Sequence, residues 1–121
     1  MTTAVSQVIV LVSHMPSSLR FYRDVLGLES VSESPTWSEL RAGAVSIGLH
    51  AGREPSATGR ANGVDAGTLA MCLTVPDLAR TCRTLRAQGI EVDGPNVVED
   101  LPPMATLYDP DGISLVLQQA Q

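Results

Sequence analysis

The sequence predicts an α+β fold made of two βαβββ modules. Three observations lead to this prediction. The order of one strand, one helix and three strands occurs twice in the 121 residues, each predicted helix ends at a glycine, and an Asp-Pro-Asp-Gly turn joins the last two strands. We place module one at about residues 5–50, a linker at 51–66 and module two at about 67–118, all in a single domain.

Module one begins with a short, β-branched apolar run at 5–12, which predicts a strand. A helix should follow, because Pro16 suits a first helical turn and apolar residues recur at helical spacing from Leu19 to Leu26. Gly27 then provides the residue that ends the helix. Further strands are predicted at 28–33, 36–42 and 45–50.

The linker at 51–66 is rich in glycine, alanine and polar residues and has no hydrophobic period. Loops of this length inside a compact domain are typically either connectors or functional lids. Both interpretations stay open for this segment.

Module two repeats the pattern with a strand at 68–75 and a helix at 77–88 that stops at Gly89. The segment Asp109-Pro110-Asp111-Gly112 fits a type I turn between the last two strands. Four further segments are predicted to be extended: 90–92, 97–100, 104–108 and 113–118. The first two are short and can also be one interrupted strand.

Composition narrows the possible functions. The net charge of −5 argues against nucleic-acid binding, and no apolar run approaches the ~20 residues of a membrane helix. All eight basic residues are arginine, so lysine Schiff-base chemistry and a Walker-type phosphate loop are excluded, and a bacterial source is suggested. Two cysteines and no visible secretory signal predict a cytoplasmic location.

Strand alternation separates an apolar face, which the helices should cover, from a mixed face that carries the only tryptophan. No third helix is available for the mixed face, which is therefore solvated, buried against a partner, or curved into a pocket. The candidate ligand-binding residues on it are Gln7, Trp37, Glu39, His50, Cys72, Met104, Tyr108 and Gln118.

Each candidate has a functional and a structural interpretation. Trp37 suits stacking on an aromatic ligand or packing at a dimer interface, and Met104, Tyr108 and Gln118 pose the same choice more weakly. His50 is either a solvated histidine or one half of an acid–base pair with Glu39. Cys72 is either a reactive thiol or a small buried hydrophobe. A metal ion held by His50, Glu39 and Cys72 is a further alternative.

Several segments resemble the vicinal oxygen chelate superfamily of glyoxalases, bleomycin-resistance-type binding proteins and ring-cleaving dioxygenases. The matching segments occur in the family's order and cover almost the whole chain: SLRFYRDVLGL at 18–28, Leu49-His50, TVPDL at 74–78 and DPDG at 109–112. The resemblance implies that the two modules form a curved mixed sheet around a cavity, and that the protein is a homodimer.

The resemblance also implies where metal ligands would stand in the metal-dependent members. Carried onto this chain, those four positions are Gln7, Gly48, Ala70 and Val116. Three of them lack a side-chain donor, so the sequence predicts no metal, no cofactor and no catalytic residue.

The leading functional hypothesis is a metal-free protein that binds a small molecule. It would sequester an aromatic or cationic compound, and the analogue in the family is an antibiotic-resistance protein. The alternative is a metal-dependent or acid–base enzyme of the same superfamily, either a glyoxalase-like lyase, an isomerase or a dioxygenase. A third hypothesis is a structural module whose mixed face is only a dimer interface.

Overall fold

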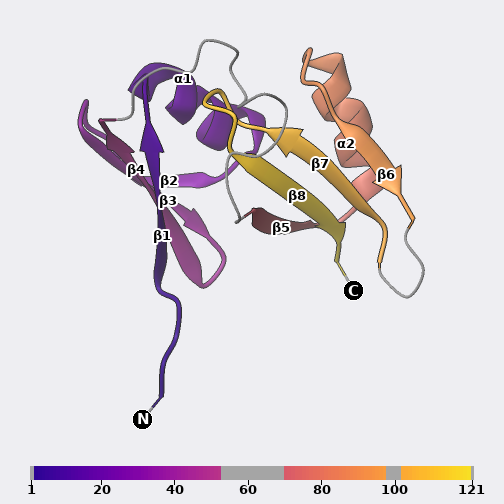
Figure 1. The fold of residues 1–121 in the computed structure, drawn as a ribbon, viewed down its shortest axis with the longest axis horizontal. Helices are drawn as coiled ribbons and strands as arrows, with labels where there is room; N and C mark the ends of the chain where they lie inside the picture. The colour runs from indigo at the N-terminus through magenta and orange to yellow at the C-terminus, as the bar shows by residue number, and fades with distance from the viewer. Residues whose placement is uncertain (1, 53–69, 98–101, 121) are drawn as a thin grey trace. The chain divides into compact units, whose positions relative to one another are not determined.

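The computed structural model describes residues 2–52, 70–97 and 102–120. The chain divides into two compact units, unit one at Met1–Ala57 and unit two at Thr58–Gln121. Each unit contains one four-stranded mixed sheet and one helical segment (Figure 1), so the predicted α+β class is confirmed. The predicted linker at 51–66 lies outside the described residues except for its first two, and the module bounds stay a prediction.

The sheet of unit one has the strand order β1-β4-β3-β2. Its strands are β1 (Gln7–Val12), β2 (Glu29–Ser32), β3 (Trp37–Ala42) and β4 (Val45–Ala51). β1 runs parallel to β4, whereas the other neighbours are antiparallel. β4 is thus a central strand, with hydrogen-bonded partners on both sides.

The helical segment of unit one begins at Met15, directly after the cap residue His14, and ends before Gly27, so Pro16 lies in its first turn as the sequence predicts. The Nδ1 atom of His14 caps α1 (Met15–Leu19) by accepting the backbone N–H of Ser17 at 3.2 Å. The segment continues as a π-helix, η1 (Arg20–Val25), and Gly27 adopts the left-handed conformation with φ +77°. Apolar spacing alone does not distinguish the π-helical turns from α-helical ones.

The core of unit one lies between this helical segment and one face of the sheet, where α1 packs on β4. The sheet contributes alternate residues, as strand periodicity predicts. The buried hydrophobic side chains are Val10, Val12, Leu40, Ile47 and Leu49 from the sheet and Met15, Leu19, Phe21 and Tyr22 from the helix.

The sheet of unit two has the order β5-β8-β7-β6, with β5 parallel to β8. Its strands are β5 (Met71–Val75), β6 (Asp93–Asn96), β7 (Met104–Tyr108) and β8 (Ser114–Gln119). α2 (Leu78–Ala87) packs on β6, β7 and β8 through Leu78, Cys82 and Leu85. Among the described residues, no helix combines the length and the apolar character that a membrane crossing requires.

Two caps bound α2 where the sequence predicts a helix. The carboxylate of Asp77 accepts the backbone N–H of Arg80 at 3.1 Å, and Gly89 adopts φ +83° beyond the last turn. The Arg86 side chain then donates to the carbonyl of Val92 at 2.9 Å and to that of Gly94, which ties the helix end to β6.

The position of β6 corrects the sequence prediction. We expected extended structure at 90–92 and 97–100, but the strand is Asp93–Asn96, and 98–100 lie outside the described residues. The Gly94-Pro95 pair inside it argues against a strand by residue type. β6 tolerates the pair because it is an edge strand whose pairing with β7 is irregular between Asp93 and Asn96.

The predicted turn at 109–112 is confirmed. The N–H of Gly112 donates to the carbonyl of Asp109 at 2.9 Å, which closes the turn. The Asp109 carboxylate is only 3% exposed and accepts the N–H groups of Asp111 at 2.9 Å and Ile113 at 2.8 Å. This side chain therefore satisfies backbone groups that would otherwise be buried without partners.

Leu40→Ala should destabilise unit one, because Leu40 is fully buried between the sheet and the helix. We expect a loss of about 2–5 kcal/mol in the free energy of unfolding, measured by urea denaturation. Leu11→Ala is the matched control, since Leu11 is 52% exposed and should change stability by about 0.5 kcal/mol or less. Equal losses for the two variants would contradict this account of the core.

Asp109→Ala should cost about 1–3 kcal/mol, because the buried N–H of Asp111 and the part-buried N–H of Ile113 lose their acceptor. Asp109→Asn keeps a side-chain oxygen at the same place and should cost much less. Thermal unfolding of both variants tests this, and a larger loss in the asparagine variant would refute the proposed role of the side chain.

Candidate functional site

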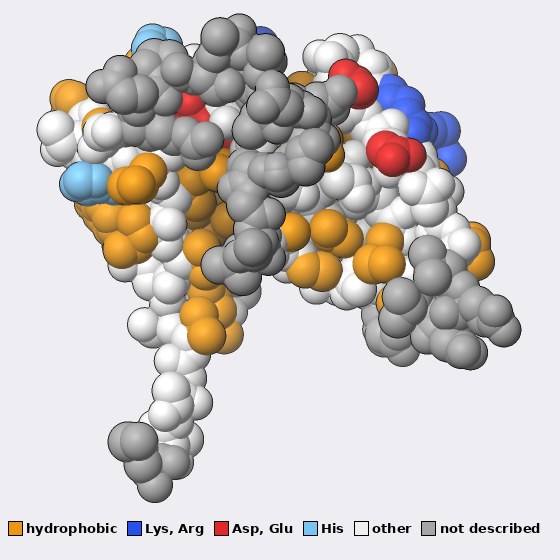
Figure 2. Space-filling view, in the orientation of Figure 1, with side chains coloured by type: hydrophobic (Ala, Val, Ile, Leu, Met, Phe, Trp, Pro, Cys, Tyr) orange, Lys and Arg blue, Asp and Glu red, His pale blue; other side chains and the backbone are white. Residues whose placement is uncertain are grey.

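The sheet of unit one has a second face, opposite the helix, which we call the helix-free face of unit one. Its edge strand β1 exposes Ile9 and Leu11, at 57% and 52% of their surface. Hydrophobic side chains gather over this part of the unit (Figure 2). Cross-strand pairing arranges the face in three rows, which are Gln7 with Ser46 and Arg41, Ile9 with Gly48 and Glu39, and Leu11 with His50 and Trp37.

The indole of Trp37 lies directly over Gly48. A Cβ atom at position 48 would stand 2.3 Å from Cη2, 2.7 Å from Cζ2 and 3.1 Å from Cζ3 of the ring. The first two separations are shorter than any real Cβ contact, so this ring position requires glycine. Trp37 is half-buried, and its ring also meets that of His50 edge-on, with centroids 6.2 Å apart and planes at 60°.

Glu39 and His50 occupy neighbouring rows of this face. Register pairs Glu39 with Gly48 and His50 with Trp37, so the two candidates are diagonal neighbours. In the described part of the chain no hydrogen bond or ion pair joins their side chains. The geometry thus places an aromatic ring, and not a carboxylate, opposite the imidazole.

Gln7 stands at the far end of the face from Trp37. Its Nε2 donates to Ser46 Oγ at 3.1 Å across the β1–β4 pair. This bond orients the amide along the sheet surface.

The helix-free face of unit two carries the other four candidates. Cross-strand rows place Cys72 with Val116 and Thr106, Thr74 with Gln118 and Met104, and Ser114 with Tyr108. Gln118 Nε2 contacts Met104 Sδ at 3.6 Å. Both thiols are free: that of Cys72 is exposed, and that of Cys82 lies on the buried side of α2.

The metal-ligand positions that the resemblance implies do not fit a metal centre. Gly48, Ala70 and Val116 have no side-chain donor, and Gln7 offers a neutral amide already bound to Ser46. Across residues 2–52, 70–97 and 102–120, no group of three or more His, Cys, Asp or Glu side chains could hold a metal ion.

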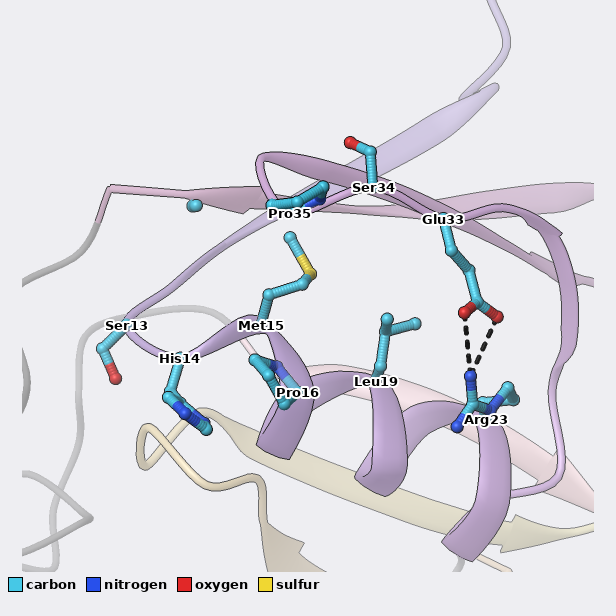
Figure 3. Close-up of a pocket in the computed structure, with 10 residues that line it drawn as sticks. Ser13, His14, Met15, Pro16, Leu19, Arg23, Glu33, Ser34 and Pro35 are labelled. Atoms are coloured by element: carbon cyan, nitrogen blue, oxygen red, sulfur yellow. Dashed lines mark hydrogen bonds and ion pairs between the residues drawn. The ribbon is translucent and has the colours of Figure 1, made fainter.

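A separate pocket of about 590 Å³ lies on the helical side of unit one. Figure 3 shows Arg23 and Glu33 at one end of it, Ser13 and His14 at the other, and Met15 and Leu19 between them. Sequence reasoning did not find this pocket, because its walls come from segments that approach one another only in the fold. The remaining lining residues are Pro16, Ser34, Pro35 and Ala51.

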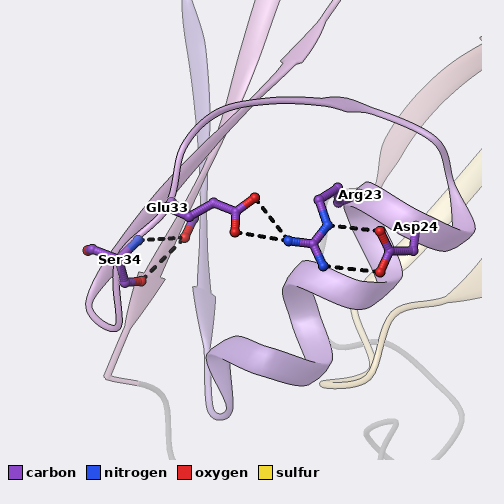
Figure 4. Close-up of polar contacts among 5 residues, drawn as sticks. Arg23, Asp24, Glu33 and Ser34 are labelled. Carbon is purple, nitrogen blue, oxygen red and sulfur yellow. Dashed lines mark hydrogen bonds and ion pairs between the residues drawn. The ribbon is translucent and has the colours of Figure 1, made fainter.

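Arg23 joins the helix to the segment that follows β2 (Figure 4). Its Nη1 lies 2.9 Å from both oxygens of Glu33, and its Nε and Nη2 lie 2.8 and 3.1 Å from the carboxylate of Asp24. Hydrogen bonds from Ser30 and Arg23 lower the pKa of Glu33, and the bond from Arg23 lowers the pKa of Asp24.

Sequence comparison identifies the class of protein that this double βαβββ arrangement defines. The profile of the Glyoxalase/Bleomycin resistance protein/Dioxygenase superfamily matches residues 4–117. The chain therefore belongs to this superfamily, as the resemblance implies. A search of curated protein sequences found no significant match.

Solved structures share the fold over nearly the whole chain. TnmS3, an antibiotic binding protein from Streptomyces sp. CB03234, is 23% identical with a TM-score of 0.77, covering 99% of this chain and 98% of that one. Lactoylglutathione lyase from Agrobacterium tumefaciens is 19% identical with a TM-score of 0.76, covering 99% and 96%. SMU.1112c is 24% identical with a TM-score of 0.80, covering 98% and 99%.

Arg23→Gln should raise the pKa of Glu33, because one of the two side chains that stabilise its carboxylate is lost. A carboxyl group whose folded pKa is depressed stabilises the fold above its unfolded pKa, and that stabilisation is lost as pH falls through the folded pKa. NMR titration of the Glu33 side-chain carbonyl measures the shift. Arg20→Gln is the control on the same helical segment, and an equal rise there would contradict the assignment.

Proposed function

We propose that this chain is a metal-free binding protein that takes up a small aromatic or cationic compound. One observation carries the proposal: the indole of Trp37 lies over a glycine at position 48, which the resemblance assigns to a metal ligand in the metal-dependent members. An aromatic face suits stacking on a planar guest, whereas it provides no donor atom for a metal ion.

The charge of the protein and of the site supports a guest with a positive charge. The net charge is −5, and the carboxylate of Glu39 stands two residues from Trp37 on the same face of β3. No ion pair engages Glu39 within the described residues, and the side chain is half-buried. A cation above the indole would gain from both the ring and the nearby carboxylate.

The similarity to TnmS3, an antibiotic binding protein, is consistent with sequestration of a toxic compound as the biological role. The other predicted ligand contacts, Cys72, Met104, Tyr108 and Gln118, lie on the helix-free face of unit two and stay predictions. The homodimer and the cytoplasmic location remain predictions.

The enzymatic alternative is supported by the similarity to lactoylglutathione lyase. Its metal-dependent form requires donors that Gly48, Ala70 and Val116 do not supply, whereas its acid–base form requires Glu39 and His50 to act as a pair. Stoichiometric metal in protein purified without chelators would favour the enzyme over the binding protein.

Trp37→Ala should weaken guest binding by about 10-fold, equivalent to about 1.4 kcal/mol, because the stacking surface is lost. Isothermal titration with matched cationic and neutral planar aromatic compounds measures the effect. Trp37→Phe keeps an aromatic ring and should lose less.

Thr84→Ala, on the exposed side of α2, is the control and should bind like the wild type. If none of the compounds binds the wild type, the binding function is wrong. If they bind Trp37→Ala with unchanged affinity, the guest does not stack on Trp37.

A further inference from the structure

We propose that Trp37 and Gly48 form one steric unit in which the indole occupies the space that a metal-ligating side chain would need. Gly48 is then the residue that positions the ring, and a donor restored at position 48 must displace the indole of Trp37 from its place. The steric claim stands on the geometry of unit one alone. The use of the ring as a stacking surface rests on the proposed function.

The first step of the argument is the distance between the ring and position 48. Three carbons of the six-membered ring lie 2.3–3.1 Å from where a Cβ would stand. Every coordinating side chain carries a Cβ, so it would meet the ring at its first atom whatever its χ1 rotamer.

The second step is that the backbone of β4 cannot give way. Gly48 lies between β1 and β3 and pairs with Ile9 on one side and Glu39 on the other. Its neighbours Ile47 and Leu49 are buried in the core on the opposite face. A clash at position 48 must therefore be relieved by moving the indole, because moving the strand would disturb two ladders and the core.

The third step is that the ring has a defined place at the edge of the face. Trp37 is the first residue of β3 and pairs with His50, whose ring it meets edge-on. Displacing the indole from Gly48 would disrupt this contact and turn the ring toward solvent. The contact between the two rings therefore depends on the indole staying over Gly48.

The first test uses Trp37 as the only tryptophan of the chain. Gly48→Ala should red-shift its fluorescence, change its near-UV circular dichroism and increase its quenching by acrylamide. Ser46→Thr adds one methyl group to the same face of β4, two residues away, and should leave all three signals unchanged. Unchanged signals in folded Gly48→Ala would overturn the proposal.

A comparison in a background without the indole covers the case in which Gly48→Ala unfolds. If the ring is the obstacle, Trp37→Ala/Gly48→Ala should unfold at a higher temperature than Gly48→Ala. A double variant that is no more stable than Gly48→Ala would overturn the steric unit.

The second test asks directly whether the indole blocks a ligand position. G48H would place an imidazole two residues from His50 on one face of β4, a spacing at which two imidazoles can share a Ni²⁺ ion. We expect W37A/G48H to bind Ni²⁺ at least about 10-fold more tightly than G48H, with W37A alone as the control for His50. The proposal would be overturned if G48H and W37A/G48H bound Ni²⁺ equally tightly, or if neither bound it.

Neither test needs a guest molecule, so its outcome is separate from that of the proposed function. A ring that moves in Gly48→Ala, in a protein that binds no planar compound, would leave the steric unit intact and remove the binding function. A planar guest that binds the wild type and Gly48→Ala equally, in a variant whose indole has not moved, would support the binding function and overturn the steric unit.

Discussion

The absence of a side chain at Gly48 is the constraint on which the helix-free face of unit one depends. β4 is central in its sheet, and its alternate residues Ile47 and Leu49 are committed to the core. The strand can therefore neither shift nor rotate to make room on its other face. Only a residue without a Cβ lets the six-membered ring of Trp37 rest against the backbone at this point.

Local capping and ion pairing hold the elements within each unit. His14 and Asp77 cap the two helical segments with their own side chains, and Gly27 and Gly89 end them. In unit one, Arg23 ties the helix to Glu33 beyond β2. These contacts are local in sequence or join adjacent elements, so each of them lies within one unit.

Much of this organisation was predictable from the sequence, and the reason is periodicity. Alternation in the strands assigned Leu40 to the core and Trp37 to the opposite face, and residue types marked the helix ends and the turn at Asp109. Register was not predictable, because pairing Trp37 rather than Glu39 with His50 depends on how far β3 is offset from β4. β6 was misplaced because Gly94 and Pro95 signal a break that an edge strand tolerates.

Membership of the superfamily does not by itself decide between binding and catalysis, since solved relatives of this fold include both an antibiotic binding protein and a lyase. The decision lies in a few positions on the helix-free faces. With the indole where it lies here, a Cβ at position 48 would stand 2.3 Å from the ring, so a donor at 48 and the ring in this place compete for the same space. Under the proposal made above, a single backbone can serve coordination or stacking, and the pair of residues at 37 and 48 decides between them.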